Sequence, residues 1–154
     1  NGYSMRWRVY FMGKWIRHGG THKPYFLRLF RYGKGSVENK IMDEHIVVEG
    51  RIKKLSNDLI HYDYKGLEAW INKHVWYSNL EIETYNKKAI NKKRNFYYKL
   101  PLFFRAKLYY IYRYYFQFGF LDGREGKILI YLQAYWYRFI VDAKIYEQRK
   151  KIKI

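Results

Sequence analysis

The sequence predicts a mixed α/β chain in which short strands and loops precede about three amphipathic helices. Three observations support this prediction. Glycine-containing turns separate short β-branched and aromatic runs throughout residues 1–64. Apolar residues then recur at spacings of three and four in residues 66–85. Finally, Pro101 opens a strongly aromatic stretch with the same helical spacing, and proline suits the first turn of a helix.

The predicted strands are short and lie in the first part of the chain. They are expected at residues 6–10, 25–30, 44–50 and 59–64, and the turns between them at Gly19-Gly20, Lys23-Pro24 and Gly33-Lys34-Gly35. The run Ile46-Val47-Val48 carries the clearest strand signal because β-branched residues favour extended backbone.

The first helix is expected over residues 66–85, where the apolar face would consist of Leu67, Trp70, Ile71, His74 and Val75. A polar and basic connector follows at residues 86–94. The expected parts of the chain are therefore residues 1–64, residues 65–98 and a basic, aromatic helical region at 99–154.

Two further helices are expected, over residues 101–118 and 125–148. In the first, one apolar stripe contains Leu108, Ile111, Tyr115 and Phe118, and a roughly opposite stripe contains Arg105, Tyr109 and Arg113. This second stripe is expected either to contact lipid headgroups or to be a solvated helix face. In the last helix, Arg138 and Asp142 are spaced to form an i, i+4 ion pair.

Composition restricts the partners and the chemistry. The 154 residues suit one domain, and the formal charge of +18 predicts an anionic partner such as a nucleic acid, an acidic membrane or a phosphate group. With no cysteine, the chain has no disulfides and no cysteine nucleophile. The chain starts at Asn1 without a visible signal peptide, and we expect it to be part of a longer protein.

Met42-Asp43-Glu44-His45 is the main catalytic candidate. Two adjacent carboxylates beside a strand can supply a general base that takes a proton from an acceptor hydroxyl. A solvated acidic turn explains the same residues, and chemistry alone favours that alternative.

The other candidates are basic or glycine-rich. In the segment from Trp15 to Pro24, the Gly19-Gly20 pair lets backbone amides approach a phosphate, and a plain surface turn is the alternative. Arg28 and Arg31 lie in or beside a strand-like run, where they either contact phosphate or line a solvated face. His61 is expected to be structural rather than a ligand. No nucleotide-binding glycine motif, catalytic serine motif or D-x-D pair is present.

Taken in order, these motifs resemble the C-terminal half of bacterial family 2 glycosyltransferases of lipopolysaccharide-core and exopolysaccharide assembly. The matching segments are Tyr10 to Gly20, Leu27 to Arg31, Met42 to His45, Leu59 to Tyr62, Trp70 to His74, Tyr77-Ser78, Leu100 to Leu102, Gly119 to Gly123, Trp136 to Arg138 and Asp142 to Lys144. The resemblance implies a GT-A-like fold whose N-terminal half, outside this chain, holds the nucleotide-sugar and a Mg or Mn ion through a D-x-D motif. This chain alone is expected to bind no metal, to lack activity by itself and to supply the acceptor side.

The resemblance also implies roles for individual residues. Glu44, or alternatively Asp43, would be the base of an inverting sugar transfer. The substrate side would include His18, Gly19, Gly20, Arg28, Arg31, His45 and His61, with His61 assisting a diphosphate or metal. The acceptor would be a saccharide or a lipid-linked sugar.

The expected location is the cytoplasm, on the inner face of the cell membrane, and no nucleic-acid partner is expected. The alternative hypothesis is a non-enzymatic basic module that binds a membrane surface or nucleic acid through rings interleaved with cations. No recognised DNA-binding or RNA-binding signature supports the nucleic-acid version.

Overall fold

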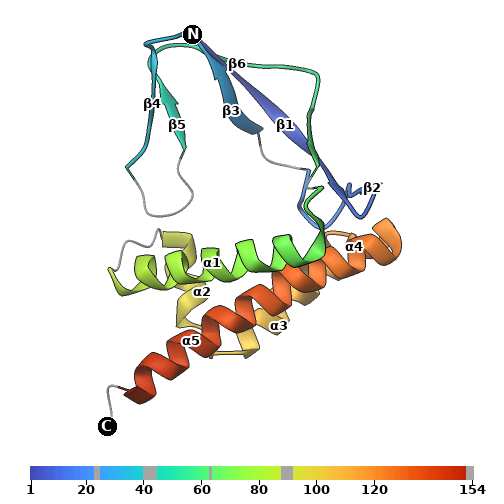
Figure 1. The fold of residues 1–154 in the computed structure, drawn as a ribbon, viewed down its shortest axis with the longest axis vertical. Helices are drawn as coiled ribbons and strands as arrows, with labels where there is room; N and C mark the ends of the chain where they lie inside the picture. Colours follow the sequence, from blue (N-terminus) through green and yellow to red (C-terminus); the bar gives the residue numbers. More distant parts are fainter. Residues whose placement is uncertain (23–24, 40–44, 63, 88–91, 152–154) are drawn as a thin grey trace.

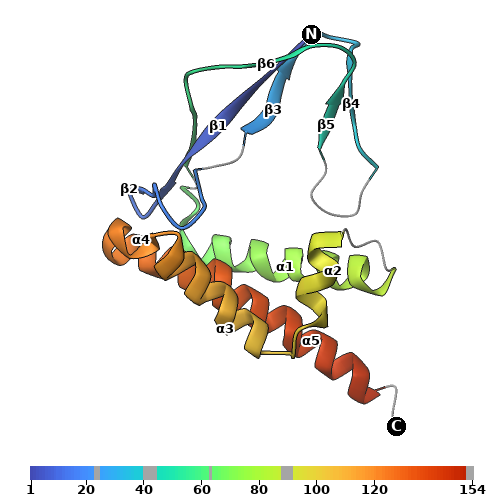
Figure 2. The same cartoon turned by 180° about the vertical axis from the view of Figure 1, so that it is seen from behind.

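The computed structural model describes residues 1–22, 25–39, 45–62, 64–87 and 92–151, with the side chains of residues 92–95 left out. It is a mixed α/β structure, as the sequence predicts. The strands form a layer that stands on one side of a group of packed helices (Figure 1). Seen from behind, α2 and α3 lie beside α1 and α5 (Figure 2).

The long strand β1 (Gly2–Phe11) organises the larger sheet because it pairs along both of its edges. Its partners are antiparallel β2 (Lys14–Trp15) and β3 (Tyr25–Phe30), and parallel β6 (Ile52–Lys54) and β7 (Leu59–Tyr62). The tight β1–β2 turn is made by Met12 and Gly13, whose φ angles of 50° and 80° are those of a hairpin turn of the primed type. A separate hairpin joins β4 (Gly35–Val37) to β5 (Ile46–Val48).

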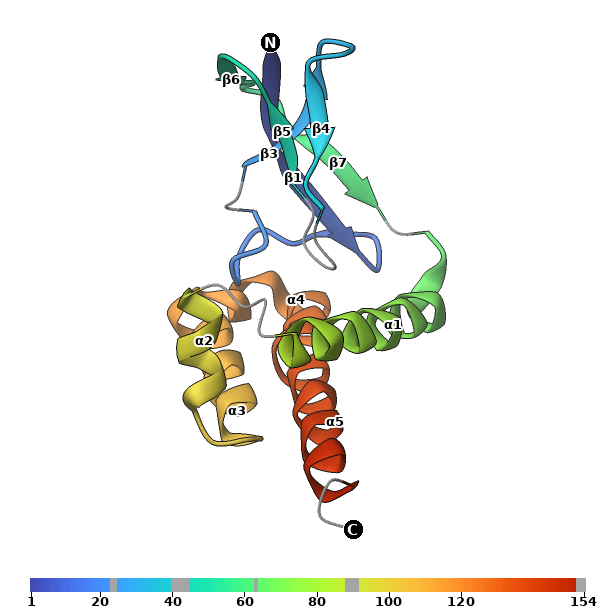
Figure 3. The same cartoon turned by 90° about the vertical axis from the view of Figure 1, so that its left-hand side faces the viewer.

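The three predicted helices are present in the predicted order, and the structure adds α2, which begins within the segment expected to be a connector. Their bounds are α1 Gly66–Asn86, α2 Lys92–Lys99, α3 Phe104–Ile111, η1 Tyr112–Phe116, η2 Gly119–Asp122, α4 Gly123–Ile130, η3 Tyr131–Trp136 and α5 Tyr137–Lys151. The π-helical segment η1 continues α3, and the π-helical segment η3 joins α4 to α5, since the junction residues keep right-handed helical backbone angles. The end of α5 leads away from the strands toward the C-terminus (Figure 3).

Two apolar clusters hold these layers together. Phe11, Ile16, Trp70 and Leu129 join the end of β1 and the loop after β2 to α1 and α4. Ile82, Tyr137, Val141 and Ile145 join α1 to α5. Burial of each such side chain contributes about 1.5–3 kcal/mol, so the sheet layer and the helices are stabilised by contacts with each other.

The expected apolar face of α1 is correct only in part. Trp70 is buried, but Leu67 and Val75 are 40% and 37% exposed. The buried face turns instead through Ser78, Glu81 and Ile82. Polar residues occupy this face because each has a partner there, which a periodicity based on apolar residues does not detect.

The helix from α3 into η1 is inverted relative to the expected orientation. Arg105 and Arg113 are 1% and 8% exposed, whereas the predicted apolar stripe includes Tyr115 and Phe118 at 57% and 56% exposure. The predicted exposed stripe of Arg105 and Arg113 is therefore wrong, and Tyr109 between them is half-buried.

A buried acidic partner explains the inversion at Arg105. Asp142 accepts hydrogen bonds from Arg105 Nε at 2.8 Å and from the Phe103 backbone amide at 2.7 Å. It does not pair with Arg138, as its spacing suggested. Arg138 Nη1 contacts Glu81 Oε1 at 2.6 Å instead. Long-range pairing of this kind brings guanidinium groups inside at a cost that apolar packing does not incur.

Candidate functional site

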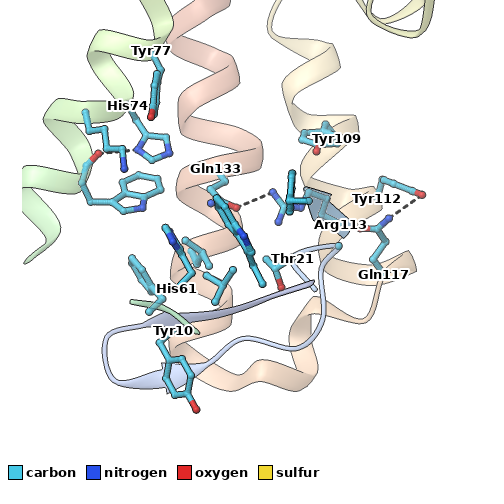
Figure 4. A pocket seen from close by; sticks show the side chains of 18 residues that line it. Tyr10, Thr21, His61, His74, Tyr77, Tyr109, Tyr112, Arg113, Gln117 and Gln133 are labelled. Atoms are coloured by element: carbon cyan, nitrogen blue, oxygen red, sulfur yellow. Dashed lines mark hydrogen bonds between the residues drawn. The ribbon is translucent and has the colours of Figure 1, made fainter. Parts of the chain in front are cut away.

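A cleft lies between the strand layer and the helices. Its two adjoining lobes have volumes of about 750 and 1010 Å³. Both lobes share side chains from β1, β3, α1, α3, η1 and η3, namely Trp7, Phe26, His74, Tyr77, Tyr109, Arg113 and Gln133. Figure 4 shows the first lobe, in which these side chains approach one another from elements far apart in the sequence.

Aromatic rings form much of the wall. Trp7 on β1 stacks on His61 of β7 with ring centroids 4.7 Å apart. In the parallel pairing Trp7 lies opposite Leu59 and Val9 opposite His61, so the two rings are diagonal neighbours on one face of the sheet. Across the cleft, Trp70 stacks on His74 of the same helix at 3.5 Å, as residues four apart on a helix do. Aromatic walls of this kind are typical of small-molecule sites, which are lined mostly by apolar and aromatic side chains.

The polar side of the cleft is built around Arg113. Its Nε donates to the Gly19 carbonyl oxygen at 2.6 Å and its Nη1 donates to Gln133 Oε1 at 3.1 Å. Burial lowers the pKa of the Arg113 guanidinium from its ordinary value, nearby Arg138 lowers it further, and Tyr109 opposes both effects. The guanidinium therefore sits in surroundings that disfavour its charge.

The loop that contains Gly19 and Gly20 is held in this position by Asp122. The 3% exposed Asp122 carboxylate accepts from the backbone amides of Arg17 and His18, and contacts His18 Nδ1 at 2.9 Å. Gly19 has a φ of 65°, and a Cβ there would lie 2.5 Å from the Ile130 side chain. The loop is thus a rigid support for Arg113, in which only glycine fits at that position.

The predicted substrate residues fall into two groups. Gly20 and His61 line the first lobe, while Arg28 and His45 line the second. Gly19 touches the site only through its carbonyl oxygen. His18 and Arg31 line neither lobe: His18 is held by Asp122, and the Arg31 backbone amide bonds to Asn1 near the far end of the sheet.

The predicted catalytic acids Asp43 and Glu44 lie outside the described residues. His45, the next residue in the sequence, lines the second lobe, and its Nδ1 is 3.4 Å from Glu38 Oε2. No Asp or Glu is among the described side chains that line either lobe.

Sequence reasoning missed three residues that define the cleft. Trp7, His74 and Arg113 were assigned to a strand, an apolar helix face and a surface stripe. The weak signal for them was compositional, since aromatic residues alternate with arginine and histidine along several segments. Only the meeting of β1, α1 and η1 shows that these rings and cations share one cleft.

Within the described ranges, no group of three or more His, Asp or Glu side chains is arranged to hold a metal ion. No helix among the described residues combines the length and apolar character needed to cross a bilayer. No protein-family model, curated protein or solved structure matches the chain.

Proposed function

We propose that this chain forms the acceptor side of an inverting glycosyltransferase, which transfers a sugar from a nucleotide-sugar donor to a saccharide or lipid-linked acceptor of cell-surface polysaccharide. The donor and its Mg or Mn ion are held by a GT-A nucleotide-binding half outside these 154 residues. The cleft is the observation that supports this proposal most directly.

The chemistry of the cleft suits a carbohydrate. A sugar has apolar C–H faces and a rim of hydroxyl groups. Trp7 and Trp70 line the cavity with apolar ring surface, while Arg113, Gln133 and His74 bring hydrogen-bonding groups to the same cavity. Its lobe volumes are those of typical small-molecule sites, about 300–1,000 Å³.

The ordered series of motifs, which resembles family 2 glycosyltransferases, implies the reaction. Glu44, with Asp43 as the alternative, deprotonates the acceptor hydroxyl, and the resulting oxygen attacks the anomeric carbon as the nucleoside diphosphate leaves with the C–O bond electrons. His45, which follows Glu44 in the sequence, lines the second lobe. Arg28 in that lobe and His61 in the first lobe orient the substrates.

The test uses the protein that includes the donor-binding half. Glu44→Gln is expected to reduce transfer by about 100-fold or more, the usual contribution of a general base, while nucleotide-sugar binding is retained. Asp43→Asn is the parallel variant, and the larger loss of the two identifies which carboxylate is the base. Unchanged turnover in both variants would exclude this tetrad as the base, and an unrelated domain upstream would refute the enzyme hypothesis.

A second part of the proposal concerns the membrane. Ten rings on the helices form a connected set, here called the ring surface, with neighbouring centroids at most 6.4 Å apart: Phe103, Tyr110, Tyr114, Tyr115, Phe118, Phe120, Tyr131, Tyr135, Phe139 and Tyr146. Six of them are exposed: Tyr115, Phe118, Phe120, Tyr131, Phe139 and Tyr146. Exposed rings with cations nearby are typical of surfaces that lie at the headgroup level of a bilayer.

The cations on the same helices are exposed too. Lys107, Arg124 and Lys127 lie on α3 and α4, and Lys150 Nζ lies 5.3 Å above the Tyr146 ring. The ring surface therefore replaces the Arg105, Tyr109 and Arg113 stripe as the proposed contact with the anionic inner face of the cell membrane. Each cation close to such a surface contributes about 1 kcal/mol.

Vesicle sedimentation tests this contact. The double variant Phe118→Ser and Tyr131→Ser is expected to bind vesicles of anionic phospholipid about tenfold more weakly, because it removes ring area from the interface. Tyr32→Ser is the matched control, since Tyr32 is 100% exposed on the strand layer, and should bind normally. Equal binding by both variants would exclude the ring surface.

A further inference from the structure

Arg113 is the most unusual charged residue of the cleft. Arg113 is only 8% exposed, and its Nε and Nη1 donate to neutral groups, the Gly19 carbonyl and the Gln133 amide oxygen. Among the described residues, no carboxylate lies within ion-pair distance of Arg113, whereas the more deeply buried Arg105 pairs with Asp142. The charge of Arg113 thus lacks a described counterion.

Burying the Arg113 guanidinium in this way costs free energy of folding unless another group compensates its charge. A buried ion that lacks an opposite charge loses several kcal/mol of solvation, and carbonyl dipoles recover only part of that. Arg138 adds a second positive charge nearby, because it also lines the second lobe. The two guanidinium groups approach the same Tyr109 ring, Arg138 at 5.6 Å and Arg113 at 5.8 Å from its centroid. Lys73 adds another positive group at the first lobe.

The backbone around the pair is also unusual. Arg113 lies in the π-helical segment η1, and Gln133 lies in the π-helical segment η3. A π-helical turn is rare and is frequently found at functional sites. Here two such turns present side chains that bond to each other at the cleft, as the dashed line between them in Figure 4 shows.

We propose that Arg113 is the centre of an anion subsite in the cleft, and that the saccharide bound there carries a carboxylate or a phosphate group. The inference rests on the proposed function for the sugar part of the ligand, whereas the anion part follows from Arg113 itself. The Arg113 guanidinium meets the anion through the N–H groups not used by Gly19 and Gln133. Tyr109, which lines both lobes beside Arg113, flanks the sugar ring.

A purely structural role for Arg113 makes a different prediction. In that case its bonds to Gly19 and Gln133 only tie the glycine loop to the helices. Replacing Arg113 would then weaken all ligands of the cleft alike, because the whole wall would shift. An anion subsite instead predicts a selective loss of acidic ligands.

The experiment measures binding of four probes to the chain by calorimetry: glucose, glucuronate, glucose 6-phosphate and inorganic phosphate. The two acidic sugars are expected to bind at least tenfold more tightly than glucose. Arg113→Gln should remove this preference and leave glucose binding within twofold. Arg149→Gln removes the same charge from an exposed position on α5 that lines neither lobe, and should change nothing.

The outcomes separate this inference from the proposed function. Equal affinity for glucose and the acidic sugars keeps a saccharide cleft and refutes the anion subsite. Arg113-dependent binding of phosphate without any sugar binding keeps the anion subsite and counts against the acceptor cleft. If no probe binds, both are refuted. A preference of glucuronate over glucose 6-phosphate, or the reverse, identifies the acidic group.

A second measurement covers the case in which Arg113→Gln fails to fold. In the wild-type chain, glucuronate should shift the backbone amide resonances of Gly20, Thr21 and Gln133, which lie around Arg113. Glucose should shift them less. The amide of Val141, buried between α1 and α5, reports on indirect effects. Shifts confined to residues away from the cleft would overturn the proposal.

Discussion

Replacing Asp142 with alanine should destabilise the chain more than almost any other single change. Asp142 is fully buried, and its carboxylate contacts the guanidinium of Arg105, which is 1% exposed. Its other oxygen accepts the Phe103 backbone amide at 2.7 Å. Alanine would leave both donors buried without their acceptor.

The size of the effect follows from these contacts. Removing one partner of a buried ion pair costs about 3–5 kcal/mol, because the other charge stays inside without compensation. The orphaned Phe103 amide is a separate loss of about 1–3 kcal/mol. A domain of this kind has about 5–15 kcal/mol of stability in all, so the Asp142→Ala variant should unfold at a much lower urea concentration.

Related variants divide the effect into its parts. Asp142→Asn keeps an oxygen for the Phe103 amide and should be more stable than Asp142→Ala by about 1–3 kcal/mol. The double variant Arg105→Met with Asp142→Leu removes both charges and should recover at least about 2 kcal/mol relative to Asp142→Ala. Glu147→Ala is the control, since the Glu147–Lys151 pair is exposed and its loss should leave the urea midpoint unchanged.

The measurement is urea unfolding followed by circular dichroism, with equal slopes required before midpoints are compared. If Asp142→Ala lowered the free energy of unfolding by less than about 1 kcal/mol, the buried ion pair of Arg105 with Asp142 would be refuted. It would also restore the expectation that Arg105 faces outward, because an exposed arginine does not depend on one carboxylate.

Two further predictions concern buried hydroxyl and carboxylate groups. The pKa of Tyr137 is raised, first by burial and second by the Glu81 carboxylate, which accepts a hydrogen bond from the Tyr137 hydroxyl at 2.7 Å. Since the unfolded tyrosine titrates at about pH 10, the protonated hydroxyl stabilises the fold below that pH, and its contribution is lost as the pH rises further. Tyr137→Phe should therefore flatten the fall of stability between about pH 9 and 11, and an unchanged slope in urea titrations would contradict this. Asp122→Ala should free the loop at residues 16–20 and lower stability by about 1–3 kcal/mol, because two backbone amides and His18 lose their acceptor; unchanged amide exchange at Arg17 and His18 would disprove this role.

The sequence by itself determined the order and type of the main elements. Helical spacing in residues 66–85 and the proline at 101 located helices that the structure contains, and the β-branched run at Ile46 to Val48 is a strand. Local signals suffice for these because turn residues and apolar spacing act through near neighbours along the chain.

Only the tertiary structure decided which faces are buried. Arg105 lies inside because Asp142, 37 residues away, meets it there, and Glu81 on α1 is buried because Tyr98, Tyr137 and Arg138 reach it. A pattern that assigns every charge to the solvent fails at such positions, since the compensating group comes from a distant segment. The cleft likewise requires β1, α1 and η1 to meet. Of the predicted substrate residues, Gly20, Arg28, His45 and His61 line the cleft, and packing alone brought Arg113 into it without a described counterion.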